Sequence, residues 1–398
     1  MTHDELDLFS DARTERRRPL RKPPRKRKRR TVLWVSMVVV LGIIAAGGYY
    51  GLRQIMDIGS YDDYSGAGET QVVIEVKDGE STGDIAATLA ESDVVASSRA
   101  FVTAAESDER VRAVQPGYYV MKTKSSGAAA VTQIVAEDAK VGNLQIKAGL
   151  QLDDIKNGDK TTAGIVSLLA KASCAELNGK STCVKPEQLR EAMKKADLAK
   201  LGVPDWALPY ATKAQPERRL EGLVMPGVYD VKPGATADEL WKQLVGESAT
   251  QLQAVGMPNI AQPTGFTPYQ VLVMASLIER EAIEKDFGKV SRVTYNRLAQ
   301  RTKLQYDSTV NYVLDRPAIR TNDEDRDKAG AYNTYQNSGL PPTPISAPSP
   351  EAFKAAAEPV AGPWLYFVRC QTDGTSCFAK TDDEHQANVD AAQERGAY

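Results

Sequence analysis

Two glutamates near the end of an apolar run are the carboxylates best suited to acid chemistry. Glu279 and Glu281 lie in the segment VLVMASLIEREAI. At about 100° per residue of a helix, both side chains emerge between apolar neighbours. Such burial raises the pKa of a carboxyl, which suits a general acid near neutral pH. The alternative is that both only pair with cations such as Arg280 or Lys285, and the pattern alone favours that interpretation.

Polar and aromatic residues suited to a sugar-binding groove follow in two segments. The first is LQYDSTVNYV at 304–313, and the second is AYNTYQNSGLPPTPI at 331–345. Amide and carboxylate groups orient sugar hydroxyls, and flat rings stack on sugar faces. Ordinary turn and core roles are the alternative for each residue taken alone. The candidate groove residues are Gln305, Asp307, Asn311, Tyr332, Asn333 and Tyr335.

The elements that must position these residues can be predicted in outline. Apart from the uncharged apolar segment 31–52, the segment 267–301 has the strongest helical pattern in the chain. Its start is marked by Thr267 and Gln270, which can form a capping box, and by Pro268 at the first helical position. We expect Gly288 to separate two helices there, and 304–313 to be strand- or turn-like. Residues 338–350 contain five prolines and must form an irregular loop. Trp364–Val368 should form a buried strand, paired with a strand that contains Phe378.

Several other chemistries lack their sequence signatures. The chain has no Ser-x-x-Lys, no G-x-S-x-G, no P-loop and no dinucleotide-binding fingerprint. Only two histidines are present, His3 and His385, so a catalytic triad or a zinc peptidase site is poorly supported. We therefore expect carboxylate chemistry without a cofactor or a metal.

The four cysteines form two local pairs. Cys174 and Cys183 flank ELNGKST-type turn residues, and Cys370 and Cys377 flank a similar short polar loop. Short loops of this kind favour two disulfides in an oxidising compartment. A zinc site is the competing interpretation, but the chain contains no C-x-x-C spacing.

Charge is distributed unevenly along the chain. Residues 1–30 hold twelve Lys and Arg against five Asp and Glu, whereas the whole chain has a net charge of -2. Residues 31–52 carry no charge and, as a helix, would cross the roughly 30 Å hydrocarbon core of a membrane. A cleaved signal peptide is the alternative, but its apolar region would be shorter and its leader less charged. The basic tail then indicates a cytoplasmic N-terminus, with the remainder of the chain outside. The tail has no interleaved aromatic residues and no nucleic-acid-binding fold around it, so we expect no nucleic-acid partner.

Five blocks of sequence follow one another in the C-terminal half of the chain. They are ASLIERE at 275–281, VSRVTYNRL at 290–298, LQYDSTV at 304–310, YNTYQNSGLPPTPI at 332–345 and FKAAAEPVAGPWLYFV at 353–368. In this order they resemble the signature blocks of the YceG-like family of endolytic murein transglycosylases. The segment LEGLVMPGVYDV at 220–231 is also similar to that family, and residues 70–141 resemble its LysM-like subdomain.

The resemblance implies an α+β fold with a single transmembrane helix, a small LysM-like subdomain and a larger mixed α/β catalytic domain. The expected divisions are a cytoplasmic tail at 1–30, the helix at 31–52, a linker at 53–69, the subdomain at 70–141 and the catalytic domain at 142–398.

The resemblance also implies roles for individual residues. The catalytic acid of the family, the second Glu of its Glu-basic-Glu motif, falls on Glu281, and Glu279 takes a supporting role at the substrate site. Gln305, Asp307, Asn333 and Tyr335 fall on positions expected to line the glycan groove. Ser308 departs from the pattern because the family usually has Pro there, which puts the local loop shape in doubt.

The expected activity is cleavage of the β-1,4 bond between N-acetylmuramic acid and N-acetylglucosamine in nascent strands, leaving 1,6-anhydro ends and terminating elongation. The implied partners are peptidoglycan strands, the bacterial plasma membrane and cell-wall synthases. Two alternatives remain: a non-catalytic peptidoglycan-binding scaffold, and a muramidase that hydrolyses the bond with Asp307 as its second carboxylate.

Overall fold

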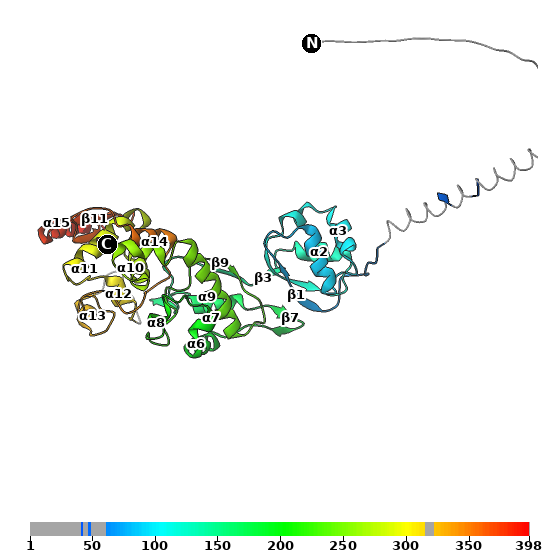
Figure 1. Cartoon of the computed structure of the whole chain (residues 1–398), viewed down its shortest axis with the longest axis horizontal. Coiled ribbons are helices and arrows are strands. Elements are labelled where there is room, and N and C mark those ends of the chain that lie inside the picture. Colours follow the sequence, from blue (N-terminus) through cyan, green and yellow to red (C-terminus); the bar gives the residue numbers. More distant parts are fainter. Residues whose placement is uncertain (1–40, 43–46, 49–60, 315–321, 398) are drawn as a thin grey trace, which may run out of the picture. The chain divides into compact units, whose positions relative to one another are not determined.

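The structure is a computed structural model that describes residues 41–42, 47–48, 61–314 and 322–397 (Figure 1). The predicted tail 1–30 and most of the predicted transmembrane segment 31–52 lie outside these residues. Among the residues that are described, no helix is long and apolar enough to span a bilayer. The compact unit Asp62–Tyr398 carries all the elements discussed below.

The first part of this unit is a small three-stranded antiparallel sheet covered by helices. The sheet has the order β1-β2-β3, with Ile74 opposite Tyr119. Ser81 caps α2 and forms a capping box with Asp84. The LysM-like character of this part stays a prediction. The elements are β1 (Gln71–Val76), α2 (Thr82–Glu91), α3 (Ser98–Ala105), η1 (Glu109–Ala113), β2 (Gly117–Lys122), α4 (Gly127–Ile134) and β3 (Lys140–Val141).

The next part joins a two-stranded sheet to a layer of helices. Strands β4 and β9 pair antiparallel although more than eighty residues separate them in the chain, with Leu144 opposite Tyr229. Trp241 of α9 is fully buried and donates a hydrogen bond of 2.8 Å to the carbonyl of Leu189 in α6. The elements are β4 (Asn143–Ile146), β5 (Ile155–Asn157), β6 (Lys160–Thr162), α5 (Ile165–Ala172), β7 (Glu176–Leu177), β8 (Lys180–Ser181), α6 (Pro186–Lys195), α7 (Leu198–Leu201), α8 (Leu208–Ala211), β9 (Gly227–Asp230) and α9 (Ala237–Ala254).

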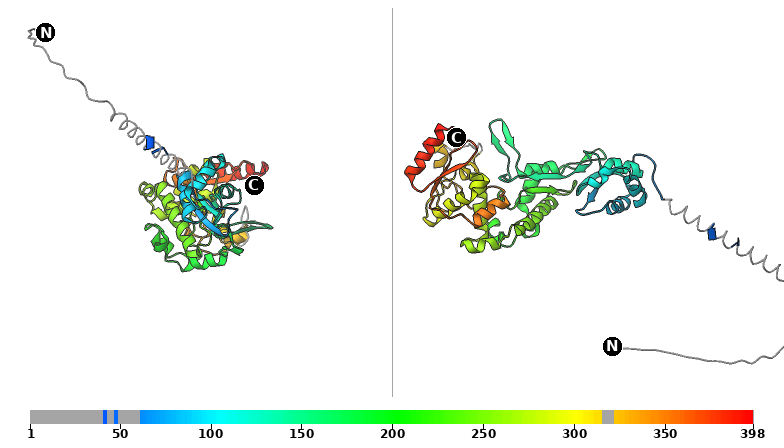
Figure 2. Two further views of the ribbon diagram at one scale, coloured as in Figure 1. Left: turned by 90° about the vertical axis from the view of Figure 1, so that its right-hand side faces the viewer. Right: turned by 90° about the horizontal axis from the view of Figure 1, so that it is seen from above.

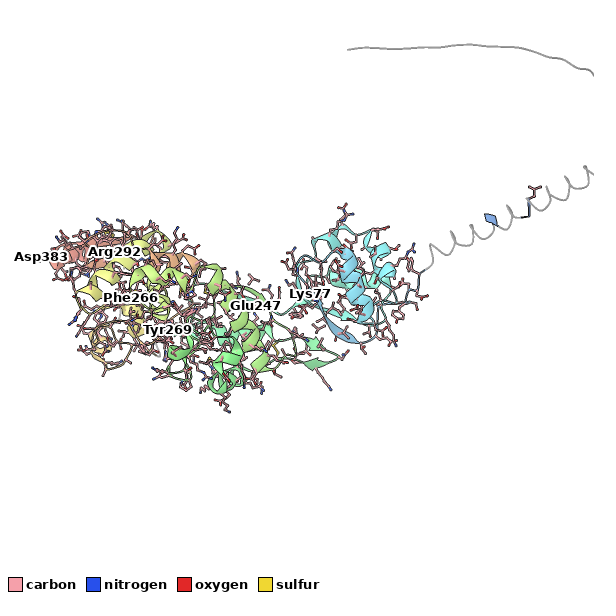
Figure 3. All side chains as sticks on the ribbon, in the orientation of Figure 1. Lys77, Glu247, Phe266, Tyr269, Arg292 and Asp383 are labelled. Atoms are coloured by element: carbon pink, nitrogen blue, oxygen red, sulfur yellow. A yellow bond between two sulfur atoms is a disulfide. The ribbon has the colours of Figure 1, made fainter. Side chains whose placement is uncertain are left out.

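Helix α10 (Pro268–Glu281) runs through the larger hydrophobic core, and every residue from Val271 to Ile278 is buried. Its predicted start is confirmed, because the Thr267 side chain accepts a hydrogen bond from the N–H of Gln270 and Pro268 opens the helix. Figure 3 labels Phe266 and Tyr269 at this start. Tyr269 stacks on Tyr210 of α8 at 4.7 Å between ring centres, which fixes the entry to the helix.

The predicted break at Gly288 is wrong. Helix α10 ends at Glu281, the following residue Ala282 is extended, and η3 (Glu284–Asp286) precedes α11 (Phe287–Ala299). Gly288 lies inside α11, where a Cβ atom would come within 2.9 Å of a Val360 side-chain carbon. A close approach of another segment, and not a helix end, therefore accounts for the glycine.

The remaining elements complete the part of the chain that contains the catalytic candidates. Figure 1 shows α10, α11, α12 and α14 gathered together, and Figure 2 shows α15, in red, beside strands β10 and β11. The pairing of Phe367 with Phe378 confirms the predicted C-terminal hairpin, although its first strand is half-buried and begins at Tyr366. The elements are η2 (Asn259–Thr264), α12 (Asp307–Asn311), α13 (Asp323–Asp327), α14 (Pro350–Ala357), β10 (Tyr366–Arg369), β11 (Ser376–Ala379) and α15 (Asp382–Glu394).

Two further sequence predictions are decided by the structure. Residues 307–311 form the short helix α12 and not a strand, because the hydroxyl of Thr309 and the backbone of 305–306 form hydrogen bonds with Thr334 instead of with a sheet.

Both predicted disulfides are present. Cys174–Cys183 closes the β7–β8 hairpin, and Cys370–Cys377 closes the β10–β11 hairpin.

Candidate active site

Glu281 is the last residue of α10, and its carboxyl lies at a groove of about 590 Å³. The pKa of Glu281 is raised to about 7, mainly by burial. Hydrogen bonding by Ser308 lowers this pKa in part, and the nearby carboxylate of Asp307 raises it. The N–H of Ser308 donates a hydrogen bond of 3.2 Å to Oε1. A carboxyl with this pKa holds its proton near neutral pH and can release it, which is what a general acid requires.

The groove is lined by residues from six separate elements and the segments between them. One side is formed by the end of α10 and the segment 304–311. The facing residues come from β10 and α15, which approach from the C-terminal part of the chain. The lining side chains with polar or aromatic groups are Arg280, Glu281, Arg297, Gln305, Tyr306, Asp307, Ser308, Asn311, Arg326, Tyr335, Tyr366, Phe367, Arg369, Asp382 and His385.

Asp307 is the second carboxylate at the groove, and it is held by two neighbours. The hydroxyl of Tyr335 donates a hydrogen bond of 2.7 Å to its Oδ1, and Arg326 forms an ion pair with it at 3.1 Å. The guanidinium of Arg326 also lies 4.9 Å from the centre of the Tyr335 ring. These contacts orient the Asp307 side chain and engage both of its oxygens.

Thr334 ties the two predicted groove segments together. Its hydroxyl accepts a hydrogen bond of 2.9 Å from the N–H of Tyr306, and its carbonyl accepts one of 3.1 Å from Gln305. Thr334 is 2 % exposed, so these bonds are shielded from water. They explain how segments some thirty residues apart in the chain come to line one groove.

Gln305 reaches the groove because the backbone turns sharply there. Its φ is 56°, a left-handed conformation that is uncommon for a residue other than glycine. The side-chain oxygen accepts a hydrogen bond of 3.0 Å from Arg297, which is itself buried and also donates to the carbonyls of Leu304 and Leu365. Arg297 therefore holds the turn at Gln305 in place, and its bonds to main-chain carbonyls satisfy its buried guanidinium.

Two of the candidate residues lie elsewhere. Glu279 accepts hydrogen bonds from the N–H and the hydroxyl of Ser349, at 2.9 and 2.5 Å, at the start of α14. Asn333 is 3 % exposed, and its amide nitrogen donates to the carbonyls of Arg326 and Lys328. Among the described residues, the groove lining includes neither of them. Asn333 holds the loop that carries Arg326 and Tyr335, and Glu279 holds the start of α14, whereas Glu281, Gln305, Asp307 and Tyr335 line the groove directly.

The C-terminal wall of the groove is the part that sequence reasoning missed. The ring of His385 stacks on Tyr366 at 5.3 Å between ring centres, and burial lowers the pKa of His385. Arg369 adds an exposed cation to the same wall. The one signal in the sequence was the second disulfide loop, which indicated that residues 366–379 are held as a unit.

The model of the YceG-like family matches residues 74–391 of this chain, which is most of its length. The chain belongs to the YceG-like family. All five of its signature blocks fall within this match. Three of them, at 275–281, 304–310 and 332–345, supply Glu281, Asp307 and Tyr335 to one groove.

The chain is also similar to proteins named endolytic murein transglycosylases. The chain is 27% identical over 333 residues to the endolytic murein transglycosylase of Bacillus subtilis (strain 168), covering 80% of this chain and 83% of that protein. It is 25% identical over 376 residues to the endolytic murein transglycosylase of Streptococcus pneumoniae serotype 2 (strain D39 / NCTC 7466), covering 89% of this chain and 64% of that protein. This chain thus spans less than two thirds of the pneumococcal protein.

A solved structure shares the fold of this YceG-like chain. The 2.6 Å crystal structure of a putative YceG-like protein from Listeria monocytogenes superposes with a TM-score of 0.52 at 24% sequence identity. The match covers 80% of this chain and 98% of the other. At this identity the likeness establishes the common fold.

Proposed function

We propose that this chain is a lytic transglycosylase of peptidoglycan, which cleaves the β-1,4 bond between N-acetylmuramic acid and N-acetylglucosamine within glycan strands. The observation that carries the proposal is the carboxyl of Glu281 at the groove, with a pKa raised to about 7. The YceG-like family and the names of its characterised relatives support the same activity.

Glu281 performs two proton transfers in the proposed reaction. Its protonated carboxyl first donates the proton to the glycosidic oxygen, and the bond to the anomeric carbon breaks. The carboxylate that results then takes the proton of the muramoyl C6 hydroxyl, whose oxygen bonds to the same anomeric carbon. The product is a 1,6-anhydro end, and the acid is restored to its starting form. Because the nucleophile belongs to the substrate, its attack has the entropic advantage of an intramolecular step.

The other groove residues fit a sugar strand. The rings of Tyr335, Tyr366 and Phe367 offer flat faces for sugar rings. Gln305 and Asp307 offer oxygens to sugar hydroxyls, and Arg297 and Arg326 hold these two side chains in place. Glu279 and Asn333 lie outside the groove lining and act on it only indirectly. Glu279 holds the start of α14, and Asn333 holds the 326–335 loop.

The acid–base pair of a hydrolytic muramidase is less well supported. Such an enzyme needs a second carboxylate that acts as a base on water or as a nucleophile. Asp307 is the candidate, but Arg326 and Tyr335 already engage its oxygens. A carboxyl group whose oxygens are engaged in this way is poorly placed to activate water or to attack the anomeric carbon.

We further propose that residues 31–52 anchor the chain in the plasma membrane, with residues 1–30 in the cytoplasm and the catalytic part outside. The uncharged length of 31–52 and the basic tail before it support this arrangement. Two disulfides suit an oxidising compartment outside the cytoplasm. Tethering would confine cleavage to nascent strands near the bilayer, so that the enzyme terminates strand elongation beside the cell-wall synthases.

Mass spectrometry of strands incubated with the full chain in detergent tests the activity. We expect new internal cuts that bear 1,6-anhydromuramoyl ends in the wild type, and none with Glu281→Gln. Glu279→Gln is the matched control, since it changes a carboxylate on the same helix that does not line the groove. Hydrated reducing ends would indicate a muramidase. Strands bound but left uncut by the wild type would indicate a non-catalytic scaffold.

A further inference from the structure

Ser308 touches the proposed acid through its main chain and faces it with a buried side chain. It is the second residue of α12, and its N–H donates the 3.2 Å hydrogen bond to Oε1 of Glu281. The residue is 8% exposed. Its Oγ is buried and has no hydrogen-bond partner in the part of the chain that the structure describes.

A buried hydroxyl without a partner is costly, so it needs an explanation in the chemistry of the site. The Ser308 side chain is close enough to lower the pKa of Glu281, as does its N–H. Its hydroxyl can rotate to donate to a carboxylate or to accept from a protonated carboxyl. Ser308 can therefore serve both charge states through which Glu281 passes in the proposed reaction.

We propose that Ser308 is a positioning residue, whose N–H and hydroxyl hold the Glu281 carboxyl in place first as an acid and then as a base. This inference rests on the proposed function of Glu281. After Glu281 gives up its proton, the N–H of Ser308 stabilises the new carboxylate. A residue without an N–H at this position, such as proline, could not make that bond.

Other groups that face Glu281 act on its charge as well. Asp307 of α12 raises the pKa of Glu281, and Arg280 of α10 lowers it. Glu281 in turn raises the pKa values of Tyr306 and Tyr335. The further charged or titratable groups that line the same groove are Arg297 of α11, Arg326 of α13, Arg369 of β10, and Asp382 and His385 of α15. None of these is altered by a substitution at Ser308, so a change in the pH profile reports on Ser308 itself.

The test is the pH dependence of kcat/KM for release of anhydromuramoyl ends by the full chain, compared between the wild type, Ser308→Ala and Ser308→Pro. Ser308→Ala removes only the hydroxyl, so the alkaline limb of the profile should move upward by about half to one pH unit. Ser308→Pro, which introduces the residue that the family usually has here, removes the N–H as well, so the alkaline limb should move further upward than in Ser308→Ala. Ser308→Thr keeps both donors and should restore the wild-type profile.

Ser291→Ala is the matched control. Ser291 of α11 also has a buried hydroxyl without a partner among the described residues, and it does not line the groove. Its profile should superpose on that of the wild type. If Ser308→Ala and any folded Ser308→Pro give the wild-type profile, while Glu281→Gln is inactive, the role of Ser308 is overturned and the proposed function stands. If the wild type itself releases no anhydromuramoyl ends, the proposed function fails, and the role of Ser308 fails with it.

Discussion

Glu279 and Glu281 stand two residues apart on α10, yet their carboxylates serve different parts of the molecule. Glu279 accepts two hydrogen bonds from Ser349 at the start of α14, whereas Glu281 accepts one from Ser308 and lies at the groove. Residues two apart on a helix point in nearly opposite directions. The end of α10 can therefore hold the start of α14 through Glu279 and place the acid Glu281 at the groove.

The first prediction follows from this division. Glu279→Ala leaves the N–H and hydroxyl of Ser349 without their acceptor, so we expect the free energy of unfolding to fall by about 1–2 kcal/mol. The folded fraction should keep its cleavage activity within a few-fold. Urea unfolding followed beside an activity assay measures both. A stable Glu279→Ala protein that no longer cleaves would show that this carboxylate takes part in the reaction.

The second prediction concerns the pH dependence of activity. The pKa of Glu281 is raised to about 7, and the group must be protonated to act as the acid. We therefore expect kcat/KM to fall as the pH rises through about 7. A rate that keeps rising through this range would assign the proton transfer to a different group. The pKa of Glu221 is also raised to about 7, but its side chain lies away from the groove and accepts hydrogen bonds from Tyr312 and Leu152. Glu221→Gln is therefore the control, and it should leave the pH profile unchanged.

The third prediction concerns the pH dependence of stability. The pKa of Glu281 is higher in the folded protein than its ordinary value of 4.5. Its contribution to stability is thus complete below about pH 4.5 and is lost as the pH rises through about 7. Glu281→Gln cannot ionise, so its stability relative to the wild type should increase between these two pH values. Urea unfolding at a series of pH values measures this difference. A difference that stays constant with pH would contradict the raised pKa of Glu281.

The sequence predicts best those features that depend on near neighbours. The start of α10 follows from Thr267, Pro268 and Gln270 within one turn, and each disulfide closes a short loop. The choice of Glu281 over Glu279 came from the family resemblance. The helical pattern alone could not separate the two, because their different partners, Ser308 and Ser349, come from distant segments.

Features that depend on distant segments were missed. Residues 307–311 form a helix because Thr334 occupies the backbone donors before it, and nothing within 304–313 signals that contact. Asn333 looked like a groove residue, but its partners are the carbonyls of Arg326 and Lys328. The place of His385 in the groove wall depends on how α15 packs against β10, which no local pattern reveals.

The fourth prediction separates the two disulfides. Cys370–Cys377 closes the hairpin whose first strand supplies Tyr366, Phe367 and Arg369 to the groove. Replacing both of these cysteines by serine should reduce activity, and should cost about 2 kcal/mol of stability by the loop-closure estimate. Replacing the Cys174–Cys183 pair is the control, because that disulfide closes a similar loop that contributes nothing to the groove lining among the described residues. Equal losses of activity from both double variants would argue against a role of the C-terminal wall.

Cleavage in water enriched in heavy oxygen tests the central claim most directly. In the proposed reaction the C6 oxygen of the muramoyl residue becomes bonded to the anomeric carbon, so no oxygen from water enters the product. We predict that mass spectrometry of strands cut by the wild-type chain will find anhydro ends that carry no heavy oxygen, and that Glu281→Gln will produce no new ends. Heavy oxygen at the new ends from the first moments of reaction would contradict the account, because water would then be the nucleophile.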